Sequence, residues 1–249
     1  MFSDDELLRY SRQIMLQELD ISGQEALHEA TVLVVGLGGL GSPVALYLAA
    51  AGVGRLILVD HDTVDLTNLQ RQIAHNTASI GSAKVASAAQ SVNALNSHCQ
   101  VETVASPLTS DNGPALVQRC QVIVDCSDNF SVRFLLNRLS RRHRVPLVSG
   151  AAIRWDGQLS VYDPRRPDSP CYHCLYQETG EEEEQRCATL GVLSPLVGLV
   201  GSLQAVETIK VVTGAGSTLV GRLLLVDALQ MRFRELRLRR DRNCPVCGE

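Results

Sequence analysis

The hydrophobic positions along this chain alternate between short continuous runs and longer stretches with helical spacing. A continuous apolar run, which is typical of a buried parallel strand, lies at 31–35, and further strand candidates lie at 55–59, 101–105, 121–125 and 145–149. Stretches with the apolar spacing of a helix lie at 4–19, 43–51, 82–95 and 132–144. Strands that alternate with helices predict an α/β fold built on a doubly wound, mostly parallel sheet.

The pattern changes after residue 150. Strand-like segments lie at 157–162, 223–226 and 233–238, and we expect these late strands to join the sheet antiparallel. A buried helix is predicted at 196–213, and the acidic run at 181–184 is expected to be a solvated loop. No internal repeat or low-complexity linker is found, so we expect residues 1–249 to form a single domain.

Composition and charge exclude several classes of protein. Of the 249 residues, 45% are hydrophobic and 20% are charged, which is ordinary for a globular protein and excludes a disordered one. The formal net charge of −4 gives no general attraction to nucleic acid or to an anionic membrane surface. We therefore expect neither of these as a partner.

Two uncharged stretches, at 30–54 and 187–206, are long enough to span a membrane. Glycine and proline residues interrupt both of them, so buried core is the better interpretation. The N-terminus reads MFSDDELLRY, which is acidic and lacks the apolar segment of a secretory signal. We expect a cytoplasmic protein whose thiols stay reduced.

A glycine-rich motif follows the first predicted strand and opens a helix. Its glycines are Gly36, Gly38, Gly39 and Gly41, which fit G-x-G-x-x-G in the required context. Such glycines let the backbone turn tightly and approach a phosphate at a helix N-terminus. Asp60 ends the next predicted strand, where a carboxylate can accept hydrogen bonds from a ribose. The motif predicts a nucleotide and leaves NAD, FAD and ATP open.

Cationic and amide side chains follow in the segment Thr67-Asn68-Leu69-Gln70-Arg71. Arg71 could neutralise phosphate charge, and Asn68 and Gln70 could donate hydrogen bonds. Lys84 begins a predicted helix and could supply a second cation. The alternative for each cation is a solvated surface residue.

Asp128 and Asn129 follow the strand predicted at 121–125. The carboxyl end of a parallel strand is where ligands bind in such folds. A carboxylate beside phosphates is most simply a Mg²⁺ ligand. The alternative is a helix N-cap, because Ser127, Asp128 and Asn129 are all good capping residues.

Two C-x-x-C pairs suggest a metal site. The thiolates of Cys171, Cys174, Cys244 and Cys247 suit tetrahedral zinc, and four cysteines would make the site structural. The rival interpretation is a redox dithiol. Cys174 and Cys244 are 70 residues apart, so the metal would tie the C-terminal tail to the body of the protein. Cys187 follows the acidic run and is a possible reactive thiol.

These motifs resemble, in their order, the ubiquitin-activating-like adenylyltransferases. The segments that carry the resemblance are GLGGLG, NLQRQ, Lys84, CSDN, SGAAI and the two C-x-x-C pairs. It covers essentially the whole chain, from RYSRQ at 9–13 to Cys247. The departure is Ser127, where many members carry threonine, and it leaves Asp128 in place.

The resemblance implies an enzyme that uses ATP and Mg²⁺ to adenylate the C-terminal glycine of a small ubiquitin-fold sulfur-carrier protein ending in Gly-Gly. Pyrophosphate is released, and a separate sulfur donor then converts the adenylate to a thiocarboxylate. The segment at 149–154 resembles the molybdopterin branch, whose carrier is the small subunit of molybdopterin synthase. The thiamine-pathway carrier, or one carrier shared between pathways, is the alternative.

The resemblance also assigns roles to residues. Gly39 and Asp60 would contact ATP, and Asn68, Arg71 and Lys84 would hold its phosphates. Residues 1–150 would bind the nucleotide, and residues 151–249 the carrier and the zinc.

Three further roles come from the same resemblance. Asp128 would bind Mg²⁺ with Asn129 beside it. Arg12 would reach phosphates bound by a neighbouring subunit, which implies a homodimer with two carriers. The paired cysteines match the zinc ligands of the family.

The chemistry of this reaction needs no general base. A terminal carboxylate has an unperturbed pKa of roughly 3.5, so it is already an ionised nucleophile at neutral pH. The reaction instead needs positive charge at the α-phosphate and alignment with the leaving pyrophosphate. Arg12, Arg71, Lys84 and Mg²⁺ would supply that charge.

Other hypotheses remain open on the sequence. An NAD-dependent oxidoreductase would rest on the glycine motif and Asp60 alone. A zinc-stabilised scaffold would bind a carrier without activating it. Cys187 could form a thioester or persulfide link with the carrier, which is a minor hypothesis.

Overall fold

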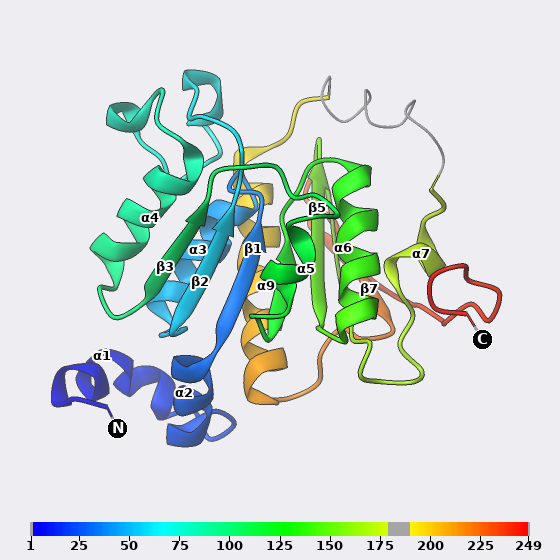
Figure 1. The fold of residues 1–249 in the computed structure, drawn as a ribbon, viewed down its shortest axis with the longest axis horizontal. Coiled ribbons are helices and arrows are strands. Elements are labelled where there is room, and N and C mark those ends of the chain that lie inside the picture. Colours follow the sequence, from blue (N-terminus) through cyan, green and yellow to red (C-terminus); the bar gives the residue numbers. More distant parts are fainter. Residues whose placement is uncertain (1, 179–189, 249) are drawn as a thin grey trace.

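In the computed structural model, which describes residues 2–178 and 190–248, the strands form one continuous eight-stranded sheet (Figure 1). Their order is β3-β2-β1-β4-β5-β6-β7-β8. The pairs from β3 to β5 are parallel and the pairs from β5 to β8 are antiparallel. The strands are β1 Thr31–Val35, β2 Arg55–Val59, β3 Gln100–Val104, β4 Val122–Asp125, β5 Leu147–Ile153, β6 Asp156–Tyr162, β7 Arg222–Asp227 and β8 Arg232–Arg237. The expected fold class is confirmed, including the late antiparallel strands.

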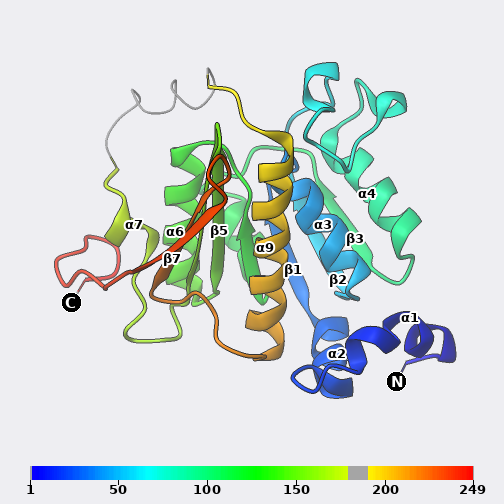
Figure 2. The same ribbon diagram turned by 180° about the vertical axis from the view of Figure 1, so that it is seen from behind.

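Helices cover both faces of the sheet. They are α1 Asp4–Ile14, α2 Asp20–Glu29, α3 Gly41–Ala50, α4 Lys84–Leu95, α5 Gly113–Val117, α6 Phe130–His143, α7 Tyr172–Leu175 and α9 Ser194–Thr213, with short 3-10 turns at η1 Leu66–Asn68 and η2 Thr77–Ser79. Helices α5 and α6 lie in front of the sheet in Figure 1, and α3, α4 and α9 lie behind it, as Figure 2 shows from the other side. The sheet is therefore the middle layer of three.

Strand β1 shows why this layering follows from the sequence. All but its first residue are buried, so both faces of the strand are covered. Leu33 and Val35 belong to the core beneath α5 and α6, whereas Val32 and Val34 belong to the core beneath α3, α4 and α9. Because successive side chains of a strand point to opposite faces, a continuous apolar run fits this central position.

Helix α9 is the one helix in the described part of the chain that is long and apolar enough to cross a membrane. It packs against α3, β5 and β6 within the layer behind the sheet. Leu196, Val197 and Val200 are buried in the same core as β1. The uncharged stretch at 187–206 thus supplies core residues from 190 onward, as expected.

The N-terminal prediction was partly wrong. A single helix at 4–19 was expected, but α1 ends at Ile14 and a second helix, α2, follows. Asp20 has a φ of +55°, a left-handed conformation that does not continue an α-helix. Its carboxylate accepts the N–H of Ile21 at 2.7 Å, which stabilises the new start.

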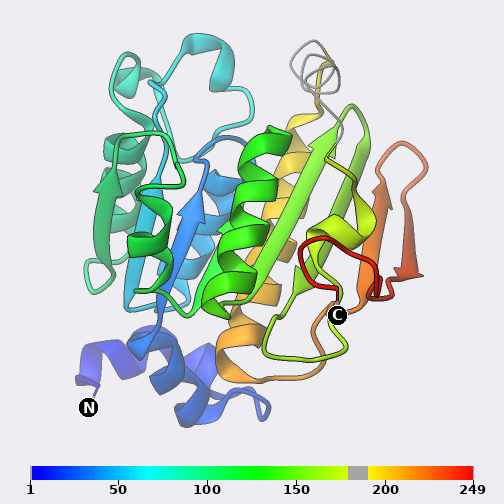
Figure 3. The ribbon, with the colours of Figure 1, turned by 45° about the vertical axis from the view of Figure 1, so that its right-hand side comes forward.

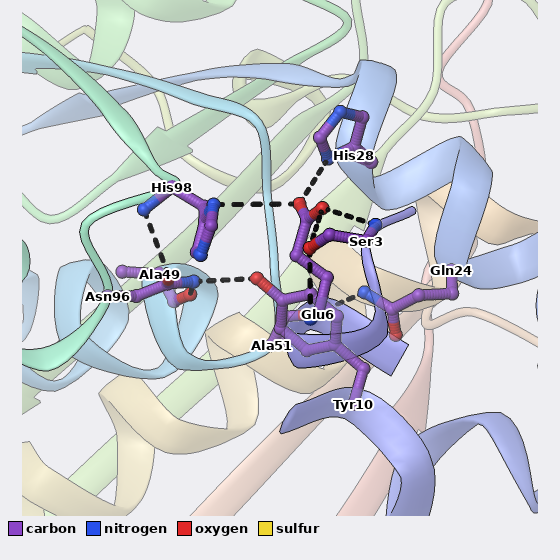
Figure 4. A network of polar contacts seen from close by, with 9 residues as sticks. All are labelled: Ser3, Glu6, Tyr10, Gln24, His28, Ala49, Ala51, Asn96 and His98. Atoms are coloured by element: carbon purple, nitrogen blue, oxygen red, sulfur yellow. Dashed lines mark hydrogen bonds and ion pairs between the residues drawn. The ribbon is translucent and has the colours of Figure 1, made fainter. Parts of the chain in front are cut away.

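Buried polar contacts fix α1 and α2 to the rest of the protein (Figure 4). The Nδ2 of Asn96 donates to the hydroxyl of Tyr10 at 2.8 Å and to the carbonyl of Ala49 at 2.7 Å. The Nε2 of Gln24 donates to the carbonyl of Ala51 at 2.9 Å. Ala49 lies in the last turn of α3, and Ala51 and Asn96 are the C-caps of α3 and α4, so α1 and α2 lie at the amino ends of the parallel strands.

The strand order also creates a crevice. Strand β1 lies between β2 and β4, so the chain leaves β1 and β4 toward different sides of the sheet. Ligands in open α/β sheets bind at such a reversal, outside the carboxyl ends of the strands. The glycine motif follows β1, and Asp128 follows β4. These two predicted site segments therefore meet.

Candidate active site and cysteine cluster

A cavity of about 900 Å³ opens at the carboxyl ends of β1, β2, β4 and β5. Its volume lies within the range of small-molecule sites, roughly 300–1,000 Å³. The residues predicted to bind nucleotide that line it are Gly36, Gly38, Gly39, Asp60, Gln70, Arg71, Lys84, Asp128 and Asn129. Segments far apart in the sequence are thus brought to one place.

The glycine loop has a geometry that side chains would block. Gly36 has a φ of +90°, and a Cβ there would lie 2.7 Å from the carbonyl oxygen of Cys126. A Cβ at Gly41 would lie 1.8 Å from the carbonyl oxygen of Gly36. Both positions require glycine, because the loop passes close to itself and to the end of β4.

Asp60 holds this loop. Its Oδ2 accepts the N–H of Leu37 at 2.7 Å, and its Oδ1 accepts the N–H of Asp62 at 2.8 Å. The carboxylate also lines the cavity. Asp60 therefore fixes the backbone that faces a bound ligand, in addition to the ribose contact expected from its position.

His75 holds the same loop from the other side, and sequence reasoning missed it. It is 6% exposed, its Nε2 lies 2.9 Å from the carbonyl oxygen of Leu37, and its Nδ1 lies 2.9 Å from the hydroxyl of Ser87. A carbonyl only accepts, so the Nε2 carries the proton and donates, and the Ser87 hydroxyl donates to Nδ1. Burial lowers the pKa of His75, so the imidazole is neutral.

Lys84 and Arg71 both face the cavity. The ammonium of Lys84 is buried and lies 2.8 Å from the carboxylate of Asp62. The hydrogen bond from Lys84 lowers the pKa of Asp62, which is therefore ionised. Arg71 donates from Nη1 to the carbonyl of Thr67 at 3.2 Å. The alternative of a solvated residue does not hold for Lys84.

A third cation, Arg133, was not predicted. It projects from the first turns of α6, is 8% exposed and lines the same cavity. Its Nη2 donates to the carbonyl of Ser127 at 2.9 Å, and its guanidinium lies 5.5 Å from the centre of the Phe130 ring. It lies within a helical pattern without a motif, so nothing local in the sequence marked it.

The structure distinguishes Asp128 from Asn129, for which a metal ligand and a helix N-cap were the two interpretations. Asn129 is the N-cap of α6, and its Oδ1 accepts the N–H of Val132 at 2.9 Å. Asp128 is exposed at the cavity. Behind them, fully buried Asp125 accepts the hydroxyls of Ser127 at 2.6 Å and Ser149 at 2.7 Å. The cap is Asn129, and Asp128 remains available to a cation.

A second group of possible metal ligands lies across the cavity. The ligand atoms of Asp60, His61 and Asp62 all lie within 4.8 Å of one another. Asp62 is already paired with Lys84, and Asp60 is bonded to the glycine loop. These contacts make Asp128 the simpler choice for a Mg²⁺ ligand.

Five predicted residues do not line the cavity. Gly41 begins α3, Thr67 and Asn68 lie in the η1 turn, and Leu69 follows that turn. Arg12 is exposed on α1, at the opposite end of the sheet from its own chain's cavity. The predicted function of Arg12 toward a neighbouring subunit is compatible with that position.

The cavity extends beyond the glycine loop toward β5, β6 and α7. This part is lined by Ala151, Ala152, Ile153, Gln158, Tyr176, Gly191 and Val192. Ala151 and Ala152 belong to the SGAAI segment, and their small side chains leave room beside the sheet. The cavity can therefore hold a second, extended ligand next to a nucleotide.

The four paired cysteines form one cluster. Their sulfurs lie within 4.8 Å of one another, with 3.6 Å between Cys171 and Cys244 and 3.4 Å between Cys174 and Cys247. These distances exceed a disulfide bond, about 2.05 Å. They approach the edge of about 3.8 Å expected for a tetrahedron of sulfurs about 2.3 Å from zinc. The cluster is compatible with zinc.

Hydrogen bonds support this cluster from outside. The Nδ2 of Asn137 donates to the sulfur of Cys171 at 3.6 Å, and the N–H of Asp241 donates to the sulfur of Cys174 at 3.4 Å. Such donors stabilise metal-bound thiolates. Figure 3 shows the red C-terminal segment beside the yellow-green α7, as expected if a metal ties the C-terminal tail to the body of the protein. We call the four cysteines and the two segments that they join the cysteine clasp.

The remaining described cysteines are buried. Burial raises the pKa of Cys99 and of Cys120 to about 12, and it also raises that of Cys126. Thiols with such pKa values are not nucleophilic at neutral pH. Cys187 and the acidic run at 181–184 lie outside the described residues.

A sequence model of the ThiF family matches residues 10–246. The chain belongs to the ThiF family. The matched region contains the glycine loop, Arg71, Lys84 and Asp128. The resemblance drawn from the motifs is therefore confirmed at the level of the family.

Curated ThiF relatives share most of the chain. The molybdopterin-synthase adenylyltransferases of Escherichia coli and Salmonella typhimurium are each 46% identical to it over 247 residues, which is 99% of this chain and 98% of the relative. The adenylyltransferase and sulfurtransferase MOCS3 of Anopheles gambiae is 47% identical over 249 residues, which covers 56% of that longer protein. The similarity to adenylyltransferases thus extends over the whole chain.

Solved structures show the same fold at lower identity. The crystal structure of E. coli MccB with ATP has a TM-score of 0.85 at 22% identity, over 96% of this chain and 73% of MccB. MccB in complex with N-formylated MccA has a TM-score of 0.86 at 23% identity, over 96% of this chain and 75% of MccB. These two structures support the α/β architecture.

Proposed function

We propose that this ThiF-family protein adenylates the C-terminal glycine of a small ubiquitin-fold sulfur carrier in molybdenum cofactor biosynthesis. The observation that carries the proposal is the convergence of the glycine loop, Arg71, Lys84 and Asp128 on one cavity. The full-length similarity to molybdopterin-synthase adenylyltransferases supports it.

The nucleotide is ATP, with its phosphates at the glycine loop. The glycine loop leads into the N-terminus of α3, and a helix N-terminus favours negative charge. Arg71 and Lys84 then neutralise phosphate oxygens, and Lys84 exchanges part of its contact with Asp62 for the phosphates. Residues 1–150 form this nucleotide-binding part.

The reaction is a displacement at the α-phosphate. A carboxylate oxygen of the carrier forms a bond to the α-phosphorus, and the bond from that phosphorus to the bridging oxygen of pyrophosphate breaks. The negative charge that develops is spread over phosphate oxygens, so fixed cations supply the catalysis. Mg²⁺, held through Asp128, would neutralise phosphate charge when bound.

The active unit is proposed to be a homodimer with two carriers. Arg12 lies on α1, far from the cavity of its own chain, with exposed Leu8, Met15 and Leu16 on the same N-terminal segment. An apolar surface of this kind favours association with a second copy. Arg12 of that second copy would then add a cation to the phosphates.

The cysteine cluster is proposed to bind one structural Zn²⁺. Four thiolates leave no open coordination position, so the metal would stabilise the fold and take no substrate. The ion would join α7 to the C-terminal segment, within the carrier-binding part at 151–249. Reduced thiols suit a cytoplasmic location.

Pyrophosphate exchange tests the proposal. The purified protein, ATP, Mg²⁺ and labelled pyrophosphate are incubated with the molybdopterin-synthase small subunit, with the thiamine-pathway carrier, or without a carrier. Exchange stimulated by the first carrier supports the proposal, and preference for the second moves the protein to the thiamine pathway. Absence of exchange with either carrier, together with tighter binding of NAD than of ATP, would favour an oxidoreductase.

A further inference from the structure

Tyr176 and Gln158 meet in the wall of the cavity, on the side away from the glycine loop. Tyr176 follows α7 directly, and Gln158 lies on β6. The hydroxyl of Tyr176 donates to the Oε1 of Gln158 at 2.6 Å, and both residues line the cavity. None of the motifs drew attention to either residue.

Aromatic packing holds the Tyr176 ring in place. Its ring centre lies 4.9 Å from that of Tyr172 and 6.3 Å from that of Phe130, which also lines the cavity. Phe130 is separated from Asp128 only by the capping residue Asn129, so Tyr176 lies near the segment that carries the candidate Mg²⁺ ligand.

The cysteine cluster fixes the segment that presents Tyr176. Cys171 is the N-cap of α7 and Cys174 lies in its single turn, and the N–H of Tyr176 donates to the carbonyl of Tyr172 at 3.0 Å. Asn137 of α6 accepts the N–H of Tyr172 at 2.9 Å and donates to the sulfur of Cys171 at 3.6 Å. A four-residue helix has little stability of its own, so these contacts determine where Tyr176 lies.

We infer that Tyr176 and Gln158 bind the main chain of the carrier's C-terminal tail, and that the cysteine clasp positions Tyr176 for this contact. The inference rests on the proposed function and specifies the part of the cavity that the carrier occupies. The nucleotide then takes the glycine-loop side, and the tail takes the side formed by β5, β6 and Tyr176.

The chemistry of a Gly-Gly tail favours these two side chains. Glycine offers a protein only its backbone N–H and carbonyl groups, and both lose water inside a cavity. A side-chain amide supplies two donors and an acceptor, and a phenol hydroxyl supplies one donor and an acceptor. Tyr176 fixes the orientation of the Gln158 amide, whose Nε2 can then donate to a tail carbonyl.

The experiment compares Tyr176→Phe and Gln158→Leu with wild type in carrier-dependent pyrophosphate exchange. Each variant removes a hydrogen-bonding group and keeps most of the side-chain volume. The KM for the carrier is expected to rise about fivefold or more, the effect of one lost hydrogen bond. The KM for ATP, and the Kd for ATP measured by calorimetry, are expected to stay within about twofold.

Tyr162→Phe is the matched control. Tyr162 is buried in the same aromatic group, 6.0 Å from Tyr172 between ring centres, but does not line the cavity. Its variant should keep the wild-type KM for the carrier. If Tyr176→Phe and Gln158→Leu both keep the wild-type KM for the carrier, the inference is overturned and the proposed function still stands. Absence of exchange by wild-type protein overturns the proposed function, and the inference with it.

Removal of the metal tests the role of the clasp. The holoenzyme is treated with a chelator, and the Kd values for ATP and for the carrier are measured by calorimetry. Weaker carrier binding with unchanged ATP binding supports a positioning role. An unchanged carrier Kd, or an equal loss of both affinities, contradicts it.

Discussion

The Nε2 of His75 lies 2.9 Å from the carbonyl oxygen of Leu37, in the middle of the glycine loop. Leu37 also donates its N–H to Asp60 at 2.7 Å, so both of its backbone polar groups are bonded to side chains. The glycines make the loop conformation possible, but they do not select it, because glycine is conformationally permissive. His75 and Asp60 select it.

Replacing His75 with alanine should weaken ATP binding. A buried carbonyl that loses its donor costs about 1–3 kcal/mol, and the freed loop should raise the KM for ATP about tenfold. The KM for the carrier should change much less. Ser87→Ala removes only the partner of Nδ1 and should have a smaller effect. Equal effects of His75→Ala on both KM values would argue against a specific action on the loop.

Arg71→Ala should nearly abolish adenylation without unfolding the protein. Loss of one group that stabilises transition-state charge lowers kcat by about 10²–10³-fold. Among the described residues, the side chain of Arg71 makes one hydrogen bond, to the carbonyl of Thr67, so stability should change by less than about 0.5 kcal/mol. The measurements are pyrophosphate exchange and thermal unfolding. Arg142→Ala, an exposed arginine in the last turn of α6, is the control that should remain active.

Asp128→Asn should raise the Mg²⁺ requirement. An amide oxygen is a weaker ligand for a hard cation than a carboxylate oxygen. The Mg²⁺ concentration for half-maximal exchange should rise at least about tenfold, since even outer-shell changes cost about 10–100-fold in metal affinity. Asp111→Asn, an exposed acidic position before α5, provides the comparison. The same Mg²⁺ dependence in both variants would remove Asp128 from the metal site.

Cys244→Ser should release the metal and lower the stability. A decrease of about 3 kcal/mol in the free energy of unfolding would lower the midpoint of thermal unfolding by roughly 6–12 °C in a chain of this size. Metal content by mass spectrometry should fall from one zinc per chain to near zero. Cys99→Ser tests a buried cysteine outside the cluster and should leave the zinc content unchanged.

Glu6 should contribute stability that disappears in acid. Its Oε2 accepts the N–H and the hydroxyl of Ser3, both at 2.9 Å, and these bonds lower its pKa (Figure 4). An unfolded glutamate has a pKa of about 4.3. Because the folded value is lower, the contribution is complete above roughly pH 5 and is lost as the pH falls through the folded pKa.

The check on Glu6 is a stability profile against pH. Glu6→Gln should unfold more easily than wild type at pH 7, and the difference should shrink as the pH falls below about 4.3, the unfolded pKa. His28 and His98 face Oε1 of Glu6 at 3.9 and 3.7 Å. A difference between the variants that does not depend on pH would exclude the proposed charge effect.

The parts of the fold that the sequence predicted best are those with local signals. Residues 31–35, a continuous apolar run, and residues 55–59 were both predicted as strands, and β1 and β2 have these bounds. Helix α2 was missed because its sequence, DISGQEALHE, contains a glycine and shows no clear apolar face: its buried residues are Gly23, Gln24 and Leu27. Helix α5 is a five-residue helix, too short to show helical spacing.

The residues of the candidate site also divide into those with a local sequence signal and those without one. Gly36, Gly38, Gly39 and Lys84 lie in motifs, and the structure places them at the cavity. Arg133 and His75 lie in ordinary helical or turn sequence, and only tertiary packing brings them to the cavity and the loop beside it. The sequence left two roles open for Asp128, a metal ligand or a helix N-cap. It could not decide between them, because the neighbouring Asn129 is an equally good capping residue and is the one that caps α6.

The close approach of Gly36 to Cys126 also affects the order of folding. One wall of the nucleotide cavity is the loop after β1, and the facing wall is the end of β4, which pairs directly with β1 although β2 and β3 lie between them in the sequence. A chain in which β4 has not yet docked has no complete nucleotide site. Nucleotide binding should therefore begin only once both halves of the parallel sheet are assembled, and ATP would act as a ligand of the finished fold and not as a nucleus for it.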